Sequence, residues 1–379
     1  MNTTNFSTLL LVAASMAAHA TAEFSVAAGT TEATTSSTNH VSFVKQWTLT
    51  AGTTTNTIDS IDLDLAGRVY VSYSSGLPSG VLGYVNVSGD SQAVVDAVTV
   101  LNDDADDVND NDDNDDANDK TGELNVRIGN STTAATTLSG YLLTEIILSA
   151  SGAVTDVKSQ RSAQVVIEDG VLVSSSTTAE LQVEASGSSA VYVSAASTAV
   201  SVRQLNLDAT STATLQFNVA SVSVSEEAQL EAQGSASLSV LGSSFEANQL
   251  EVDAQNTGKI CLAAQQVTAA NYEGQTASQI SMPNASSKYT STGSFACDES
   301  TVPAREPACV SSACAASSSS GNTATVAGSG ASTTTTTVTS TPATGNNDDA
   351  SDDTNASAVF AVFQLGAVAV IALATAGLL

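Results

Sequence analysis

A repeat of 22 to 24 residues constrains the fold of this chain more than any other feature. Units that begin at Leu181, Leu205, Ala228 and Leu250 each read apolar-x-apolar-acidic-Ala, and a second short alternating run follows in each unit. Alternation of apolar and polar residues with period two is typical of a strand with one buried face. A fixed period of this length indicates a solenoid, in which each unit covers its apolar face by stacking on its neighbours.

Each unit holds up to three such runs, separated by Gly, Ser, Asn and Thr, which favour turns. The sequence therefore predicts an all-β fold, a right-handed parallel β-helix (β-solenoid) with about 22–24 residues per coil, over residues 58–274. Disordered Ser/Thr-rich segments are expected on both sides. One buried column is expected to contain Val183, Leu207, Leu230 and Val252. A crowded inward corner is expected at Ala185, Ala209, Ala232 and Ala254.

The outward positions of the same repeats carry an acidic residue in each unit. In a stack of coils these residues would align into one row, and like charges on neighbouring strands repel by up to about 1 kcal/mol per pair. The row could bind cations such as Ca²⁺ through carboxylate oxygens. The interpretation we favour is a solvated acidic face that keeps the protein soluble. The residues are Glu184, Asp208, Glu231 and Asp253.

The four cysteines lie in or after the last repeat. An even number of cysteines in an exported chain predicts two disulfides, and the sequence leaves all three pairings open. Their clustering predicts a cysteine-containing cap over residues 275–314. A zinc site is disfavoured because no histidine lies near and no C-x-x-C motif occurs. The candidate residues are Cys261, Cys297, Cys309 and Cys314.

Both ends of the sequence resemble processing signals. An apolar run at residues 6–18, followed by A-x-A cleavage options, predicts a secretory signal peptide over residues 1–22. Residues 351–379 combine a polar spacer with an uncharged apolar tail, the pattern of a glycosylphosphatidylinositol (GPI) attachment signal. A resident transmembrane helix, the alternative, is usually flanked by basic residues, and none follows this tail. Candidate attachment residues are Gly345, Asn347 and Asp349.

Segments rich in Ser and Thr flank the predicted solenoid. Residues 23–57 contain the first strand-like run, and residues 315–350 are low in complexity. The second segment lacks the apolar side chains needed to offset the entropy of ordering, and it is expected to be an O-glycosylated stalk or a bare linker. Three N-x-[ST] motifs are candidate N-glycosylation sites in surface loops. They are Asn86, Asn130 and Asn284.

The N-terminal part of the predicted solenoid contains an acidic insertion. Residues 102–120 hold ten Asp and lie between strand-like runs at residues 94–101 and 124–126. A block of like charges is normally disordered, so we interpret this segment as a solvated insertion between two strands. Weak capture of calcium is the alternative.

Several of these motifs resemble the head-GIN domain family of proposed auto-transporter adhesins. The resemblance rests on strand-like residues 61–63 and 69–71, on a Gly-Asp turn at residues 88–90, and on an L-x-V-x-x-S-G-S unit at residues 181–188. It covers about residues 58–274. The Asp-rich insertion and the units that lack Ser-Gly-Ser depart from the family pattern. The resemblance implies a β-solenoid with an adhesive role and brings no catalytic residues.

Charge and the scarcity of histidine exclude several functions. The formal net charge is −29, with 10 Lys and Arg against 39 Asp and Glu. This charge argues against nucleic-acid binding, because contacts to phosphate need basic residues. A Ser-His-Asp triad needs a histidine base, and His40, outside the signal peptide, is expected to be a solvated loop residue. Lys158 and Arg161 are expected to share a solvent-exposed loop. We expect no catalytic residue, cofactor or metal ligand.

The sequence as a whole predicts an extracellular, GPI-anchored and glycosylated cell-surface protein with a structural or adhesive role. The expected partners are the membrane, through the lipid anchor, and either cell-wall polysaccharide or surface proteins. The runner-up is a carbohydrate-active parallel β-helix enzyme, either a polysaccharide lyase or a hydrolase. A secreted, disordered mucin-like protein is a third possibility.

Overall fold

The computed structural model describes residues 24–35, 38–52, 57–102, 122–129, 138–285, 293, 295–297 and 299–311 of the 379-residue chain. The predicted signal peptide, the Asp-rich residues 103–121, Asn130 and all residues after 311 lie outside the described residues. Cys314 and the candidate attachment residues Gly345, Asn347 and Asp349 are therefore outside as well. The described residues belong to one compact unit, Met1–Thr323.

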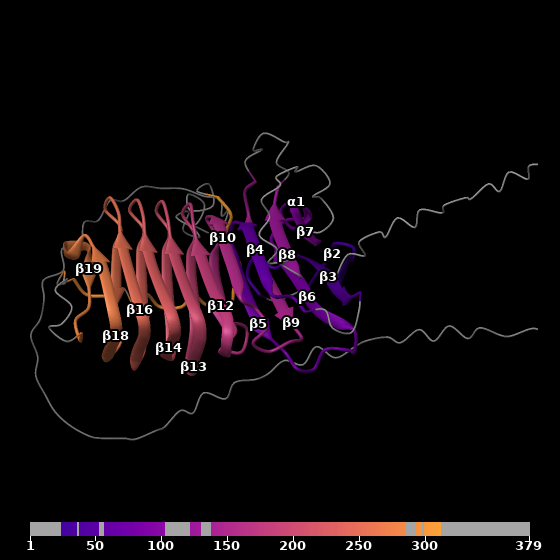
Figure 1. Ribbon diagram of the computed structural model, residues 1–379. Coiled ribbons are helices and arrows are strands. Elements are labelled where there is room, and N and C mark those ends of the chain that lie inside the picture. The colour runs from indigo at the N-terminus through magenta and orange to yellow at the C-terminus, as the bar shows by residue number, and fades with distance from the viewer. Residues whose placement is uncertain are drawn as a thin grey trace, which may run out of the picture. The chain divides into compact units, whose positions relative to one another are not determined.

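Parallel strands stack in register to form a solenoid (Figure 1). Each strand of its regular part pairs in parallel with strands one coil away. The predicted all-β solenoid is therefore confirmed. A short 3₁₀ helix, η2 (Ala277–Gln279), precedes the last of these strands. The strands are β12 (Ser175–Ala185), β13 (Ala190–Ala209), β14 (Thr214–Ala232), β15 (Ser237–Leu241), β16 (Ser244–Ala254), β17 (Lys259–Leu262), β18 (Gln266–Gln275) and β19 (Ile280–Ser281).

The stacked strands form three faces. Face A consists of β8 (Glu123–Ile128), β4 (Ser60–Leu65), β10 (Asp156–Arg161) and the C-terminal parts of β12, β13, β14, β16 and β18. Face B consists of β9 (Tyr141–Leu148), β5 (Arg68–Tyr73), β11 (Gln164–Glu168), the N-terminal parts of β13 and β14, and β15, β17 and β19. Face C consists of the N-terminal parts of β12, β16 and β18 and the middle of β13 and β14.

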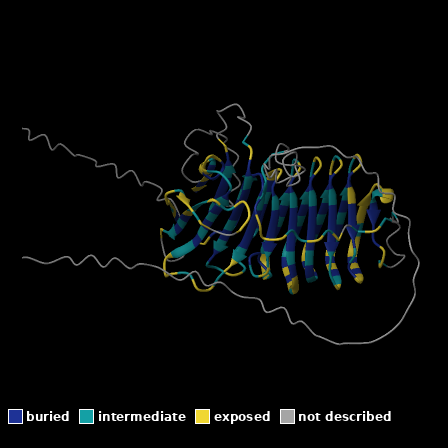
Figure 2. Cartoon of the chain, turned by 180° about the vertical axis from the view of Figure 1, so that it is seen from behind, coloured by how far each residue is buried: buried dark blue, intermediate teal, exposed yellow. Residues whose placement is uncertain are grey.

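Apolar side chains from successive coils form one continuous column inside the solenoid. Val183 pairs with Leu207, Leu207 with Leu230, and Leu230 with Val252, as the repeat predicts. The alanines at the inward corner are also in register and at most 1% exposed. Figure 2 shows buried residues alternating with more exposed residues along the strands. Each coil therefore removes its apolar face from water only by contact with its neighbours.

One residue with left-handed backbone geometry turns the chain after each of these alanines. The φ angles of Gly187, Ser211, Gly234 and Asn256 are 68°, 65°, 81° and 59°. Each residue lies two positions after the buried alanine of its coil. Glycine adopts this conformation freely and asparagine tolerates it, whereas a serine pays a steric cost. The Thr-Ser-Thr and Gln-Asn-Thr variants of the repeat therefore keep the corner of the Ser-Gly-Ser units.

The first coils do not follow the order of the chain. The coil built by β4 and β5 lies between β8 and β9 on one side and β10 and β11 on the other. In the sequence, the segment between β5 and β8 forms β6 (Val81–Gly89), the helix α1 (Gln92–Asp96) and β7 (Val98–Asn102). The β4–β5 coil therefore gains its neighbours only from segments that follow it in the sequence.

Antiparallel strands close the N-terminal end of the solenoid. On face B, β6 pairs with β9, β3 (Phe43–Ala51) pairs with β6, and β1 (Phe24–Ala28) and β2 (Glu32–Ala33) pair with β3. On face A, β7 pairs with β8. The side-chain amide of Asn102 donates to the carbonyl of Phe24 (2.9 Å), and Thr31 bonds to Asp96. These contacts bring the outermost strand of face B beside that of face A, so the two outer strands meet at this end.

The structure corrects three local expectations. Residues 88–90 do not form a turn between strands, because Ser91 accepts from the amide of Val94 and begins α1 directly after β6. Lys158 and Arg161 lie in strand β10 rather than in a loop, and Asn86 lies within β6. The same period-two pattern describes strands and short polar loops, which is why the sequence did not separate them. The described residues on either side of the Asp-rich segment lie in β7 and β8, which pair antiparallel.

The left-handed corner generates a stability prediction. A Cβ atom at Gly234 would lie 2.7 Å from the carbonyl oxygen of Ser211, so Gly234→Ala is expected to lower the free energy of unfolding by about 1–2 kcal/mol. The matched change Ser211→Gly removes a strained side chain from the same corner, and it is expected to raise stability by about 0.5–1 kcal/mol. Urea denaturation followed by circular dichroism measures both. Equal effects of the same sign would contradict a left-handed corner.

Candidate functional site

An acidic ladder runs along the outer surface of face A. Glu184 pairs in register with Asp208, Asp208 with Glu231, and Glu231 with Asp253, as the sequence predicts. Neighbouring parallel strands lie about 4.8 Å apart, so these carboxylates are repeated at that interval. At the N-terminal end the next residue in the row is Lys158, which pairs with Glu184 and lies 3.9 Å from Asp156.

Carboxamides on the neighbouring rows bond to carboxylates of face A. The amide of Asn206 donates to Glu180 one coil away (2.8 Å), and Gln249 donates to Glu227 (2.9 Å). Gln255 donates to Asp253 (2.7 Å). A hydrogen bond to a charged acceptor stabilises more than a neutral one, so these donors offset part of the repulsion within the face.

Asp208 is the carboxylate that the acidic ladder perturbs most. Burial, followed by the charges of Glu231 and Glu184, raises the pKa of Asp208 to about 6. Within the described residues no donor reaches its Oδ1 atom. Burial and the charges of Asp253 and Glu251 also raise the pKa of Glu231. Mild acid therefore removes charge from the middle of the ladder first.

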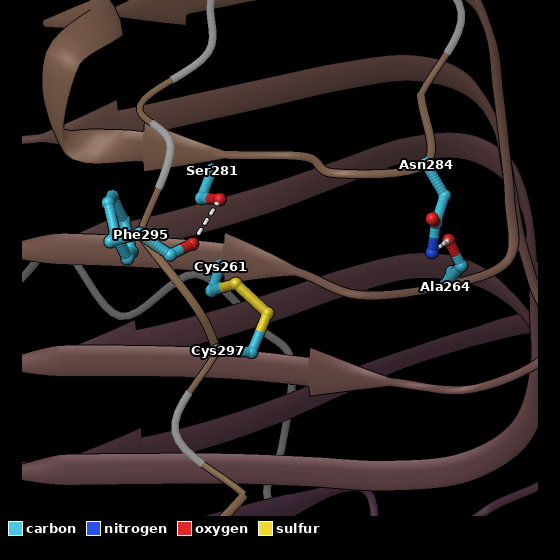
Figure 3. Close-up of a disulfide and its surroundings, with 6 residues drawn as sticks. All are labelled: Cys261, Ala264, Ser281, Asn284, Phe295 and Cys297. Carbon is cyan, nitrogen blue, oxygen red and sulfur yellow. Dashed lines mark hydrogen bonds between the residues drawn. A yellow bond between two sulfur atoms is a disulfide. The ribbon is translucent and has the colours of Figure 1, made fainter.

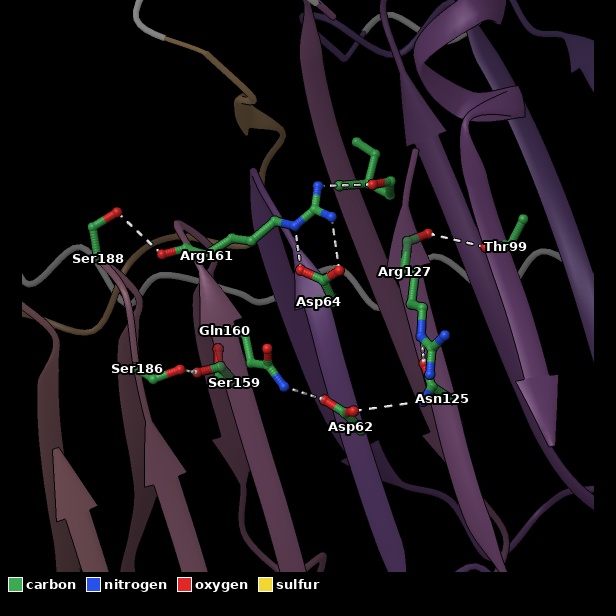
Figure 4. A network of polar contacts seen from close by, with 11 residues as sticks. Asp62, Asp64, Thr99, Asn125, Arg127, Ser159, Gln160, Arg161, Ser186 and Ser188 are labelled. Carbon is green, nitrogen blue, oxygen red and sulfur yellow. Dashed lines mark hydrogen bonds and ion pairs between the residues drawn. The ribbon is translucent and has the colours of Figure 1, made fainter. Parts of the chain in front are cut away.

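The N-terminal part of face A is neutralised by basic residues (Figure 4). The guanidinium of Arg161 pairs with Asp64 and donates to the carbonyl of Ile128 (2.9 Å). Arg127 donates to the amide oxygen of Asn125 (2.6 Å), and that residue bonds in turn to Asp62. The acidic ladder is therefore confined to the C-terminal part of face A.

Residues 295–297 and 299–311 run along face B and form what we call the strap. The strap crosses the strands from β19 and β17 to β9, where its strand β20 (Ala308–Cys309) pairs antiparallel with Leu142 and Tyr141. The predicted cysteine-containing segment therefore lies along the side of the solenoid. The outward residues Tyr70, Val166 and Tyr192 are at most 8% exposed, and Val302 of the strap packs against them.

Two arginines fix the C-terminal half of the strap to face B. Arg305 of the strap pairs with Glu145 (3.2 Å) and Glu168 (2.6 Å), and its guanidinium lies 4.6 Å from the ring centre of Tyr70. The hydroxyl of Tyr70 donates to the carbonyl of Pro303, and Arg68 donates to the carbonyl of Ala304 (2.6 Å). Bidentate and stacked contacts of this kind suit arginine and would not be reproduced by lysine.

A disulfide fixes the other end of the strap (Figure 3). Cys261 of β17 is bonded to Cys297, 36 residues further along the chain. The hydroxyl of Ser281 donates to the carbonyl of Phe295 beside it (2.7 Å). The prediction of disulfides is therefore confirmed for Cys261 and Cys297, and Cys309 is also disulfide-bonded.

The remaining candidate residues lie apart from these features. Asn284 is exposed in the turn after β19, and its amide donates to the carbonyl of Ala264 (3.3 Å). Asn86 is half-buried in β6, and its amide oxygen accepts from Gln46 (2.8 Å). The exposed ring of His40 stacks on Tyr141 with centroids 3.6 Å apart. Among the described residues no group of three or more His, Cys, Asp or Glu has an arrangement that could hold a metal ion.

The comparisons with known proteins add little to this picture. The chain matches no protein-family model and no curated protein. It is similar to the solved structure of a candidate adhesin from Parabacteroides distasonis, with 13% identity and a TM-score of 0.34, over 61% of this chain and 81% of that one. A similarity this weak establishes neither the family nor the function of this chain. The strand pairings themselves define the class of the protein as a β-solenoid, and membership of the head-GIN family stays a prediction.

Asp208 generates a prediction of pH dependence. Its pKa is higher in the folded state than in the unfolded chain, so folding loses stability as the pH rises from about 4 through about 6. Asp208→Asn is expected to raise the free energy of unfolding at pH 7 by about 1 kcal/mol, a value reduced for partial solvent screening, and to leave it unchanged near pH 4. Urea titrations at the two pH values measure this.

Glu246→Gln on face C is the matched control. Glu246 is exposed, and its neighbours in register are the uncharged Ser223 and Thr268. This change is expected to leave stability within about 0.5 kcal/mol at both pH values. A similar gain from both substitutions would mean that net charge, and not the ladder, sets the effect.

The disulfide generates a prediction about the strap. Replacing both Cys261 and Cys297 with Ala removes a cross-link over 36 residues, and it is expected to lower the free energy of unfolding by roughly 3 kcal/mol. Chymotrypsin should then cut after Phe295 faster than in the parent protein, because the cross-link no longer holds that end of the strap. Cleavage at an unchanged rate would show that the disulfide does not secure the strap.

Proposed function

We propose that this is a non-catalytic, extracellular cell-surface protein with a structural or adhesive role, in which the acidic ladder and its carboxamide neighbours bind a neutral cell-wall polysaccharide. The observation that carries the proposal is the register of face A, where carboxylates and carboxamides recur at intervals of about 4.8 Å. A polymer of repeating units can engage several coils at once, and its affinity then grows with the number of coils engaged.

The chemistry of face A favours a neutral, hydroxyl-rich polymer. Sugar hydroxyls donate to carboxylates and accept from carboxamides, and both groups are present in each coil from β12 to β16. The formal charge of −29 repels acidic polysaccharides and nucleic acids.

The anchoring part of the proposal rests on the sequence. The C-terminal tail pattern supports a GPI anchor, and the Ser/Thr-rich residues 315–350 support an O-glycosylated stalk. N-glycosylation at Asn86, Asn130 and Asn284 belongs to the same proposal. In the described part of the chain no helix is both long and apolar enough to cross a membrane.

Binding to polysaccharide tests the role of face A. The variant with Asn206→Ala and Gln229→Ala changes two carboxamides in register, and it is expected to weaken binding to a neutral cell-wall glucan roughly thirtyfold, at about 1 kcal/mol for each lost hydrogen bond. Co-sedimentation with the insoluble polymer measures this. The matched control changes Ser201 and Ser223 on face C to Ala and is expected to bind as the parent does.

Three outcomes of this experiment would overturn the proposal. Equal loss in both variants, or no binding by the parent protein, would remove face A as a binding surface. Release of new reducing ends from the glucan, abolished by Asp208→Asn, would instead establish the carbohydrate-active enzyme.

Enzymatic release tests the anchor. Phosphatidylinositol-specific phospholipase C is expected to free the protein from isolated membranes, because the lipid would be its sole attachment to the membrane. Immunoblotting of the supernatant measures the released fraction. Protein that stays in the membrane with its C-terminal tail intact would contradict the GPI anchor.

A further inference from the structure

The strap is the first folded element that a pull on the C-terminus would load. Its last described residues, Val310 and Ser311, lie beside β9, and the amide of Val310 donates to the carbonyl of Gly140 (2.9 Å). The predicted stalk begins only a few residues later, at residue 315. Tension from that direction therefore reaches β20 before it reaches any coil of the solenoid.

The contacts of the strap are arranged one after another along the solenoid. Moving back from its end, β20 holds β9, then Arg305 holds Glu145 and Glu168, and then Val302 and Pro303 hold the row that contains Tyr70. When the solenoid is held at its N-terminal end, a pull on the end of the strap folds the strap back along its own path, so these contacts are loaded in sequence rather than together. Sequential loading breaks each contact separately and requires less force than breaking all of them at once.

Two buried polar side chains of face B lie between the ends of the strap. Gln216 and Ser239 lie in the row of face B between Tyr192 and Cys261, and they are 4% and 2% exposed. Their Oε1 and Oγ atoms have no hydrogen-bond partner among the described residues. Buried polar atoms left without a partner weaken the contact that covers them. Past these residues the Cys261–Cys297 disulfide is a covalent stop.

We propose that the strap is a releasable tether, which tension on the C-terminus peels from face B as far as the Cys261–Cys297 disulfide while the solenoid stays folded. The source of tension in the cell rests on the proposed GPI anchor, whereas the mechanical behaviour does not. Peeling uncovers the aromatic rings of Tyr70 and Tyr192 together with the carboxylates of Glu145 and Glu168. That surface then fits another arginine-bearing extended segment, since it already binds one in Arg305.

Optical-tweezers measurements on the purified mature chain test the proposal without any membrane. One handle is attached through an azide-bearing amino acid in place of the exposed Thr99 in β7, at the N-terminal end of the solenoid, and the other through a tag after residue 350. The parent protein is expected to show one early, reversible step of about 50 Å in contour length, the length of the chain between Cys297 and residue 312 at about 3.5 Å per residue. Unfolding of the coils should follow only at higher force.

Two variants test the disulfide and the ion pairs of Arg305 separately. Cys297→Ala removes the covalent stop, and it is expected to lengthen the early step to about 100 Å, because peeling then continues to Ser281 in β19. Arg305→Ala is expected to keep the 50 Å step and to lower its force, because the pairs with Glu145 and Glu168 are lost.

Other results would overturn the proposal. A parent protein with no step before the coils unfold would show that the strap is not the weak element. A step of the same length in Cys297→Ala would show that the disulfide is not the stop. These results are independent of whether a GPI anchor exists, since the anchor is absent from the experiment.

Discussion

The whole structure depends on stacking in register, because no coil of this chain can bury its apolar face alone. Val183 is covered by Leu207 of the next coil, which is covered in turn by Leu230. The same register places the left-handed corner after each alanine and sets the carboxylates of face A beside one another. The repulsion within the acidic ladder is therefore a consequence of the packing that holds the fold together, and nearby carboxamides reduce it.

A stack of coils exposes strand edges at its ends, and this protein covers its N-terminal end and one side. At the N-terminal end the outermost strands β1 and β7 meet through the bond between Asn102 and Phe24. Along face B the strap covers outward apolar residues that would otherwise face water. Covering such surfaces with the chain's own segments limits association between copies.

The regular coils could be predicted from sequence because their pattern is local. Period-two alternation, an alanine slot and a turn residue recur within each unit, so residues 181–254 specify strands, register and ladder together. The order of the first coils could not be predicted, because β4 has the same pattern whether its neighbour is β8 or β10. The ion pairs of Arg305 were not predicted either, because their partners lie 160 and 137 residues away in the sequence. The sequence signal for these pairs was weak: an arginine between Pro303 and Pro307, in a stretch poor in Ser and Thr.

The return path of the strap decides which part of the solenoid lies outermost. Phe24 and Ser311 both lie at the end formed by β1, β3, β6 and β9, so the described chain enters and leaves the solenoid at the same end. The turn that carries Asn284 lies at the opposite tip, after β19. If a surface holds the C-terminus, this tip projects furthest into the surroundings. A glycan on Asn284 would then be the first group that an approaching cell, enzyme or antibody encounters.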